Sequence, residues 1–450
     1  MPNHQLNTLL RNARMVNEGA VIEGDLWIQN GRIKALGRIS GVPHNTTELD
    51  LQGRWLLPGM IDDQVHFREP GLEHKGTIET ESRAAVAGGI TSYMEMPNCN
   101  PLTINNQRLL DKHARAARSS HANYAFYLGA TNDNLEDIKS VRPDLACGIK
   151  VFMGASTGNM LVDDQATLES IFSSTALVIA THCEDTPTIL ANEQDARDRY
   201  GDAVPITEHP NIRSVEACYK SSSLAVSLAR KYGSRLHVLH LTSAKELELF
   251  TPGSIQHKRI TAEACVHHLY FNDTWYPEKG NLIKCNPAIK TPADQAALLA
   301  AIAEDRLDVI ATDHAPHTAE EKSRPYLQAP AGLPLVQHAL LSLIEQVEAG
   351  HFDLPTVVQK TAHAPALLFE VKERGFLREG YWADLVVLDT RRSTDVDTQE
   401  LYSKCGWSPF AGFTFHSRIV STFVNGVRVF HEGSFDESQR GIALEFERQI

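Results

Sequence analysis

The chain has 450 residues, of which 42% are hydrophobic and 22% charged, and its formal net charge is −13 at pH 7. This composition is typical of a globular protein, and no run of roughly 18 apolar residues predicts a membrane span. The negative charge and the lack of Lys/Arg-rich runs argue against nucleic acid as a partner. Residues 1–16 lack the apolar segment of a secretion signal and the seven cysteines form no CxxC pair, so we expect a reduced, cytoplasmic protein.

Both ends of the chain are rich in predicted strands. Asn30-Gly31 and Asn425-Gly426 each stand between alternating apolar residues. This is the strongest short-range signal for a β-hairpin, because both turn positions need positive φ. Together with a short strand at residues 383–389, these hairpins predict a small β-sandwich domain formed from both termini. We expect it to comprise residues 1–55 and 371–450, and a barrel domain to comprise residues 56–370.

The middle of the chain alternates short apolar runs with helix-like segments. Two of these helices are expected to end at Gly88-Gly89 and before Gly233, where Arg230 and Lys231 also suit a helix C-terminus. Eight repeats of strand and helix predict an α/β fold, specifically a (β/α)8 TIM-type barrel. The apolar runs begin at residues 56, 89, 123, 148, 177, 235, 259 and 308.

Each run is apolar first and polar last, and the C-terminal ends of barrel strands are where this fold builds active sites. Converging imidazoles and carboxylates are what a zinc-type hydrolase needs, although each residue alone is weak evidence. His237, His268 and His314 are better explained as hydrogen-bonded structural residues, and Asp313 could cap a helix. The polar strand ends are His66, Arg68, Asn98, Lys150, His182, His240, His267, Asp313 and His317.

Lys150 lies in the apolar run "GIKVFMG", where an unpaired ammonium group is costly to bury. One explanation is a salt bridge to a barrel carboxylate. The other is covalent, because a lysine of lowered pKa can add CO2 and the resulting carbamate can bridge two metal ions.

The stretches "HFREPG", "MEMPN", "IKVFMG", "THCED", "LHVLHLTS", "AEACVHHL", "KCNPAIK" and "ATDHAPH", in this order, resemble the dihydroorotases of the cyclic amidohydrolase superfamily. The resemblance runs from about residue 55 to residue 390. It implies a barrel with a flanking β domain, a binuclear zinc site, and interconversion of dihydroorotate and N-carbamoyl-aspartate in pyrimidine synthesis. The implied metal ligands are His66, carboxylated Lys150, His182, His240 and Asp313, and the implied substrate-binding residues are Arg68, Asn98, His317 and Asn286.

The implied chemistry agrees with the residue types. Arg68 can bind the carboxylate of dihydroorotate through paired, charge-assisted hydrogen bonds. Opening a cyclic amide needs an activated water, an electrophile at the carbonyl and a proton for the leaving nitrogen. We expect Asp313 to take the proton from the attacking water and to deliver it to the ring nitrogen.

Gln64 departs from the family, which usually has two histidines here, at 64 and 66. A neutral amide oxygen is a poorer zinc ligand than imidazole. Gln64 or water could fill the position in an active binuclear enzyme, or a single ion held by His182 and His240 could suffice. In a third hypothesis the chain is a non-catalytic scaffold for aspartate carbamoyltransferase. The retained pocket residues, among them Arg68 and Asp313, argue against it, because a scaffold has no physical need for them.

The rival enzyme classes are hydantoinases, dihydropyrimidinases and allantoinases, whose substrates lack the ring carboxylate that Arg68 would bind.

A homodimer is expected only from the frequency of dimers among soluble oligomers. The segments 154–164 and 318–335 carry glycines or prolines near the expected barrel mouth. They are either gating loops or plain connections.

Overall fold

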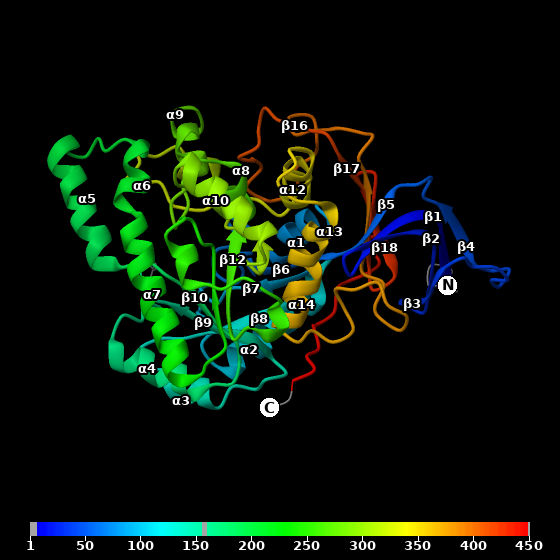
Figure 1. The fold of residues 1–450 in the computed structure, drawn as a ribbon, viewed down its shortest axis with the longest axis horizontal. Coiled ribbons are helices and arrows are strands. Elements are labelled where there is room, and N and C mark those ends of the chain that lie inside the picture. Colours follow the sequence, from blue (N-terminus) through cyan, green and yellow to red (C-terminus); the bar gives the residue numbers. More distant parts are fainter. Residues whose placement is uncertain (1–6, 155–159, 449–450) are drawn as a thin grey trace.

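Eight parallel strands form the predicted barrel in the computed structural model, which describes residues 7–154 and 160–448 (Figure 1). They are hydrogen-bonded in the order β13-β12-β11-β10-β9-β8-β7-β6. A parallel bridge between Val65 and His314 brings the two edges together, with the His66 amide donating to the His314 carbonyl at 2.7 Å. The strands are β6 (Met60–Val65), β7 (Ile90–Glu95), β8 (Asn123–Gly129), β9 (Ala146–Phe152), β10 (Ile179–His182), β11 (Leu236–Val238), β12 (Ile260–Cys265) and β13 (Val309–Ala311).

Helices alternate with these strands around the barrel. The ends expected for two of them are confirmed, since α1 is capped by Gly88 and α7 by Gly233, whose φ of 68° lies in the left-handed region. Within the described residues, no helix is long and apolar enough to cross a membrane. The helices are α1 (Ile78–Ala87), α2 (Asn106–Ser119), α3 (Leu135–Lys139), α4 (Gln165–Ser174), α5 (Thr186–Tyr200), α6 (His209–Ile212), α7 (Val215–Tyr232), α8 (Val266–Tyr270), α9 (Tyr276–Lys279), α10 (Pro292–Ala303), α11 (Ala319–Lys322), α12 (Ala339–Glu348), α13 (Leu354–Val358) and α14 (Ala364–Leu368).

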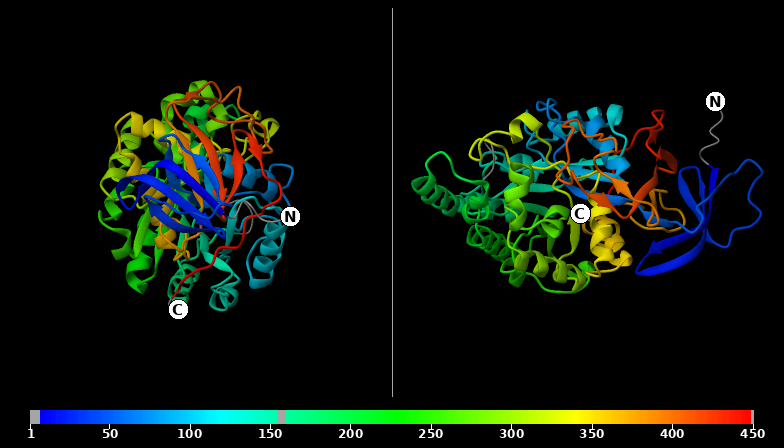
Figure 2. Two further views of the ribbon diagram at one scale, coloured as in Figure 1. Left: turned by 90° about the vertical axis from the view of Figure 1, so that its right-hand side faces the viewer. Right: turned by 90° about the horizontal axis from the view of Figure 1, so that it is seen from above.

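The β domain predicted from both termini is confirmed, and its strands form one continuous nine-stranded sheet beside the barrel (Figures 1 and 2). The order is β19-β18-β17-β14-β5-β1-β2-β3, with β4 paired to β1. The strands are β1 (Asn7–Asn17), β2 (Ala20–Gln29), β3 (Arg32–Gly37), β4 (Thr47–Asp50), β5 (Trp55–Pro58), β14 (Leu385–Asp389), β17 (Arg418–Val424), β18 (Val427–His431) and β19 (Ser434–Phe435), and a separate pair joins β15 (Thr394–Asp395) to β16 (Thr414–Phe415).

The two predicted Asn-Gly turns meet each other in this sheet. Both turns join neighbouring antiparallel strands, β2 to β3 and β17 to β18, and all four turn residues have positive φ. An added Cβ at Gly426 would lie 2.5 Å from the Cα of Gly31, so glycine is also required by close backbone approach. This contact joins the N-terminal and C-terminal parts of the domain.

Gly59 joins the terminal sheet to the first barrel strand, and we predict that Gly59→Ala destabilises the protein. An added Cβ would lie 2.1 Å from Oγ1 and 2.2 Å from Cγ2 of buried Thr91. Overpacking of this kind costs about 1–3 kcal/mol. Thermal unfolding followed by circular dichroism should give a lower Tm for Gly59→Ala. Partial recovery is expected in the Gly59→Ala/Thr91→Ala double variant, and equal losses in the single and double variants would contradict this contact.

Candidate active site

A cavity of about 180 Å³ lies at the C-terminal ends of the barrel strands. Every residue that the family resemblance implies as a metal ligand or substrate-binding residue contributes to its lining, although these residues come from strands far apart in the sequence. The lining comprises Gln64, His66, Arg68, Asn98, Lys150, Phe152, His182, His240, Asn286, Asp313, Ala315, His317, Pro330, Ala331 and Gly332.

His66 and Asp313 face each other across the seam between β6 and β13. The Nδ1 atom of His66 lies 2.7 Å from Asn98 Oδ1, which can only accept, so Nδ1 carries the proton. The lone pair of His66 Nε2 then points at Asp313 Oδ1, 3.2 Å away. A lone pair and a carboxylate oxygen at this distance repel each other unless a cation lies between them, which is the arrangement of two ligands on one metal ion.

His182 and His240 form a second facing pair. The Nδ1 atom of His182 lies 3.0 Å from Nε2 of His240, while His182 Nε2 donates to Glu184 at 2.9 Å. Arg213 also donates to Glu184, at 2.6 Å, so this buried carboxylate is ion-paired. Burial, together with the neighbouring His182 and Lys150, holds the pKa of His240 well below its usual value. The facing ring nitrogens His182 Nδ1 and His240 Nε2 belong to two residues that line the cavity, and Glu184 fixes the orientation of His182.

Lys150 projects from β9 into the same cavity and is 1% exposed. Burial lowers the pKa of its ammonium group to about 8. In the described part of the chain, no carboxylate oxygen lies within ion-pair distance of Nζ, and the nearest aromatic contact is Phe152, whose ring centroid is 4.7 Å away. A salt bridge, the simpler explanation of this buried lysine, is therefore not found among the described residues.

Gln64 lies inside the cavity but turns its amide nitrogen, not its oxygen, toward Asp313. The Nε2 atom donates to Asp313 Oδ1 at 3.1 Å, and Gln64 Oε1 lies 3.6 Å from the Cys265 sulfur, whose thiol has a shorter contact with Glu263 Oε1 at 3.3 Å. An amide nitrogen has no lone pair for a metal ion. In this arrangement Gln64 acts as a hydrogen-bond donor to Asp313.

Arg68 lies beside His317 at the rim of the cavity, where burial and the neighbouring charges of Arg68 and Lys75 lower the pKa of His317 and keep it neutral. The Nε of Arg68 donates to the Pro316 carbonyl at 3.0 Å, and its Nη2 lies 3.1 Å from His317 Nε2. Lys75 donates to His317 Nδ1 at 3.0 Å and forms an ion pair with Glu321 at 3.0 Å. No carboxylate oxygen of the described residues lies within ion-pair distance of Arg68, which is only 8% exposed. A buried guanidinium without a counter-ion favours an anionic ligand.

Comparison with known proteins agrees with this geometry. Residues 53–246 match the family described as Dihydro-orotase-like, and residues 204–429 match the Amidohydrolase family. The dihydroorotase of Listeria welshimeri is 31% identical, over 94% of this chain and 99% of that protein. The chain belongs to the dihydroorotase-like amidohydrolases. A second relative, the dihydroorotase of Methanothermobacter thermautotrophicus, is 30% identical over 93% of this chain and 90% of that protein.

Solved structures place this dihydroorotase-like chain among related barrels. The L-hydantoinase (dihydropyrimidinase) of Arthrobacter aurescens superimposes with a TM-score of 0.91 at 25% identity, covering 98% of this chain and 100% of that one. The dihydropyrimidinase of Brevibacillus agri NCHU1002 has a TM-score of 0.88 at 22% identity, with the same coverage. The barrel with a β domain from both termini is therefore the shared fold of these proteins.

The donor set of this family member fits divalent metal ions. His66 with Asp313 and His182 with His240 each present converging atoms, and His240 Nδ1 is a buried nitrogen without a hydrogen-bond partner. Imidazole and carboxylate ligands with an open side toward a cavity are typical of catalytic metal sites. Amidohydrolases generally bind a metal, in keeping with this chemistry.

Several supporting residues were missed from the sequence. Glu184 and Arg213 lie behind His182, and Lys75 lies behind His317. Only Glu184 carried a signal, because it stands two residues after His182 in "THCED". His267, expected among the strand-end residues, is fully buried and does not line the cavity, and His314 is a structural histidine bonded to Glu81 at 2.8 Å.

The segment 318–335 supplies one wall of the cavity through Pro330, Ala331 and Gly332. Buried Lys322 holds it in place, because its ammonium group donates to the carbonyls of Pro330 at 3.0 Å and Gly332 at 2.9 Å. In the other segment predicted to gate the cavity, residues 155–159 lie outside the described residues.

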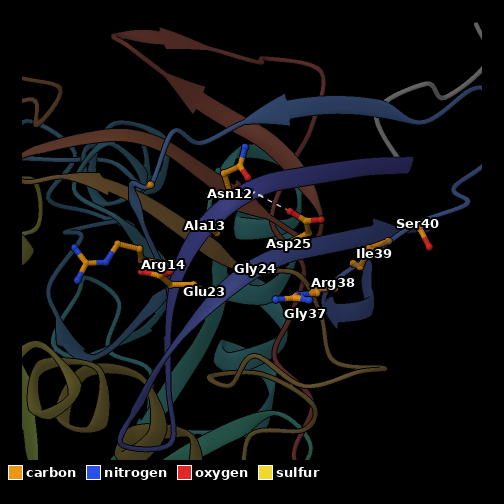
Figure 3. A pocket seen from close by; sticks show the side chains of 11 residues that line it. Asn12, Ala13, Arg14, Glu23, Gly24, Asp25, Gly37, Arg38, Ile39 and Ser40 are labelled. Atoms are coloured by element: carbon orange, nitrogen blue, oxygen red, sulfur yellow. Dashed lines mark hydrogen bonds between the residues drawn. The ribbon is translucent and has the colours of Figure 1, made fainter.

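A larger hollow, of about 520 Å³, lies away from these residues on the β domain (Figure 3). It is lined by β1, β2 and the end of β3, and the Asn12 amide donates to Asp25 across it at 3.1 Å. None of the predicted catalytic or metal-binding residues lines this hollow. The candidate active site is therefore the smaller cavity in the barrel.

Proposed function

We propose that this protein is a dihydroorotase, which reversibly hydrolyses the cyclic amide of dihydroorotate to N-carbamoyl-aspartate in pyrimidine biosynthesis. The proposal rests on Arg68, whose buried guanidinium has no carboxylate partner among the described residues. Arg68 lines a cavity that is also lined by potential metal ligands. The ring carboxylate of dihydroorotate supplies the missing counter-ion. The names of the relatives from Listeria and Methanothermobacter support the same activity.

Arg68, Asn98 and His317 are proposed to bind this carboxylate. Because Asn98 Oδ1 accepts from His66, the amide NH2 of Asn98 is left to donate to a ligand. Lys75 donates to Nδ1 of His317, so His317 Nε2 carries a proton that now goes to the Ala331 carbonyl at 3.0 Å. Substrate binding would exchange that carbonyl for the carboxylate.

Zinc is the proposed metal, as one or two ions held by His66, Lys150, His182, His240 and Asp313. When bound, zinc would polarise the amide carbonyl and increase the acidity of water at neutral pH. The unpaired Lys150 amine, with its pKa near 8, is suited to attack CO2 and release a proton, forming a carbamate that is a stronger ligand. Gln64 is proposed to hold Asp313 rather than to bind metal.

Asp313 is the proposed catalytic base and acid. One of its oxygens would accept the proton of the attacking water, and the same group would then protonate the leaving ring nitrogen. Asn286 lines the cavity with its buried Oδ1 unpartnered, so this oxygen is free to accept from a ring N–H. Gln64 keeps Asp313 in position through its hydrogen bond to Oδ1.

Hydrolysis of a hydantoin or dihydropyrimidine is the second candidate, favoured by the structural likeness to the Arthrobacter L-hydantoinase. Purified enzyme should be assayed with dihydroorotate, dihydrouracil, hydantoin and allantoin. Dihydroorotate is expected to give the highest kcat/KM. A preference for an uncharged ring would overturn the proposal, and no turnover of any substrate with zinc bound would favour the scaffold hypothesis.

Removal of metal and CO2 is expected to abolish dihydroorotate turnover. After chelation, zinc with bicarbonate should restore more activity than zinc in CO2-free buffer, because the Lys150 carbamate needs CO2. A carbamate carbon signal from 13C-labelled bicarbonate would identify the modification directly. Equal recovery with and without bicarbonate would remove Lys150 carboxylation from the proposal. The homodimer, the association with aspartate carbamoyltransferase and the cytoplasmic location stay predictions.

A further inference from the structure

A second group of potential metal ligands lies inside the barrel, outside the cavity. Asp63 on β6, His237 on β11 and Glu263 on β12 are each 0% exposed. One ligand atom from each lies within 4.8 Å of the others. A register irregularity between Asp62 and Val65 accompanies the inward position of Asp63 on its strand.

The polar atoms of this group lack ordinary partners. Both carboxylate oxygens of Asp63, the Oε2 of Glu263 and the Nε2 of His237 are buried without a hydrogen bond. Buried polar groups are normally hydrogen-bonded, and a buried charge without compensation is strongly unfavourable. Among the described residues, His237 is the only basic group within ion-pair distance of Asp63 and Glu263, so one imidazole faces two carboxylates and a divalent cation would compensate both charges.

The proton positions around His237 can be assigned from its neighbour. The single hydroxyl proton of Thr261 goes to the Leu236 carbonyl at 3.1 Å, so Thr261 Oγ1 accepts from His237 Nδ1 at 2.8 Å. Although burial opposes it, the facing carboxylates raise the pKa of His237 to about 9, so Nε2 carries a proton that a metal ion would replace. The Nε2 atom lies on the side of the two carboxylates. It points at Asp63 Oδ2, 3.2 Å away, and at Glu263 Oε2, 3.6 Å away.

This pattern is that of a metal ligand with a supporting hydrogen bond on its other nitrogen. Ligands bound tetrahedrally to zinc at about 2.0–2.1 Å lie about 3.4 Å from one another, close to the two separations at His237. A divalent ion would also neutralise the charges of Asp63 and Glu263. The two-carboxylate, one-imidazole set suits zinc or a similar divalent transition metal.

We propose that Asp63, His237 and Glu263 bind a divalent transition metal ion, zinc for the experiments below, inside the barrel and separately from the catalytic cavity. The ion would be structural, because its ligands are fully buried and none of them lines the cavity. The other oxygen of Glu263 accepts from the His240 amide at 3.0 Å. The buried ion would thus fix the backbone of a residue that faces the cavity.

Anomalous diffraction locates the ion directly. Crystals of the whole protein, grown after incubation with excess Zn²⁺, are measured above and below the zinc absorption edge. We expect a difference peak between Asp63, His237 and Glu263, separate from any peak in the cavity. No peak at this position, whatever the occupancy of the cavity, would overturn the proposal and leave His237 as a protonated partner of the two carboxylates.

Zinc content of variants gives an independent measure. Asp63→Asn removes a charge but no hydrogen bond of the side chain, and should bind one zinc ion fewer per chain than the wild type. His121→Gln is the matched control, because His121 is also buried with neither ring nitrogen hydrogen-bonded and with a carboxylate, Glu437, 3.8 Å from Nε2, but lies outside both sites. Equal zinc content in all three proteins would contradict the site. If Asp63→Asn does not fold, the anomalous difference map of the wild-type crystals still tests the site. Normal dihydroorotate turnover in a protein that shows no zinc peak between Asp63, His237 and Glu263 would contradict this inference and leave the proposed function standing.

Discussion

Asp313→Asn is expected to lower kcat for dihydroorotate hydrolysis by about 10²-fold to 10⁴-fold, the range for loss of a general acid–base group. Asparagine keeps the shape of the side chain and tolerates the left-handed backbone at this position, where φ is 50°. It cannot accept a proton from water. The measurement is initial rate under saturating dihydroorotate, with circular dichroism to confirm that the variant is folded.

Asp308→Asn is the matched control for this variant. Asp308 is equally an aspartate at β13, but it precedes the strand, is 2% exposed and pairs with Lys258 at 2.7 Å. Its loss should reduce stability while leaving kcat of the folded enzyme within a few-fold of the wild type. Wild-type kcat in Asp313→Asn would exclude Asp313 as the proton-transfer group.

Arg68→Met is expected to lower kcat/KM for dihydroorotate by about 10²-fold to 10³-fold, which corresponds to about 3–4 kcal/mol of lost binding to the carboxylate. Residual hydrolysis of dihydrouracil, which lacks the carboxylate, should change far less. The measurement is therefore the ratio of kcat/KM for the two substrates in wild-type and variant enzyme.

Arg68→Lys tests whether the positive charge of Arg68 is enough to bind the carboxylate or whether its paired hydrogen bonds are also needed. Lysine and methionine both meet the same positive φ of 73°, so the backbone strain is common to the two variants. Lysine keeps the charge but cannot donate two parallel hydrogen bonds. The kcat/KM of Arg68→Lys for dihydroorotate should therefore lie between those of the wild type and Arg68→Met. A parallel fall in turnover of dihydroorotate and dihydrouracil would mean that Arg68 supports the fold of the cavity instead of recognising the carboxylate.

Much of the fold could be predicted because its signals are local. The Asn-Gly turns specify hairpins through their backbone preferences, and Gly233 ends α7 for the same reason. The position of His66, Lys150 and Asp313 at strand ends predicted one shared cavity, since parallel strands present their C-terminal ends on the same side of a barrel.

The partners of these residues could not be predicted in the same way, because contacts across the barrel depend on distance in space and not on spacing in the sequence. His237 illustrates the limit. The sequence indicated an ordinary structural histidine, and Thr261 does bond its Nδ1, but the two carboxylates facing Nε2 come from the neighbouring strand β12 and from β6, the first strand of the barrel.

The sequence by itself determined the order of the barrel strands, the two hairpins, the polar residues that end several barrel strands and the family resemblance, all of which depend on residue type and short-range spacing. Only the tertiary structure decided that Gln64 donates to Asp313, that Arg68 has no carboxylate partner among the described residues, and that Asp63 meets His237 and Glu263. The reason is physical. Hydrogen-bond direction, burial and charge pairing are set when distant strands close the barrel, and no single segment contains that information.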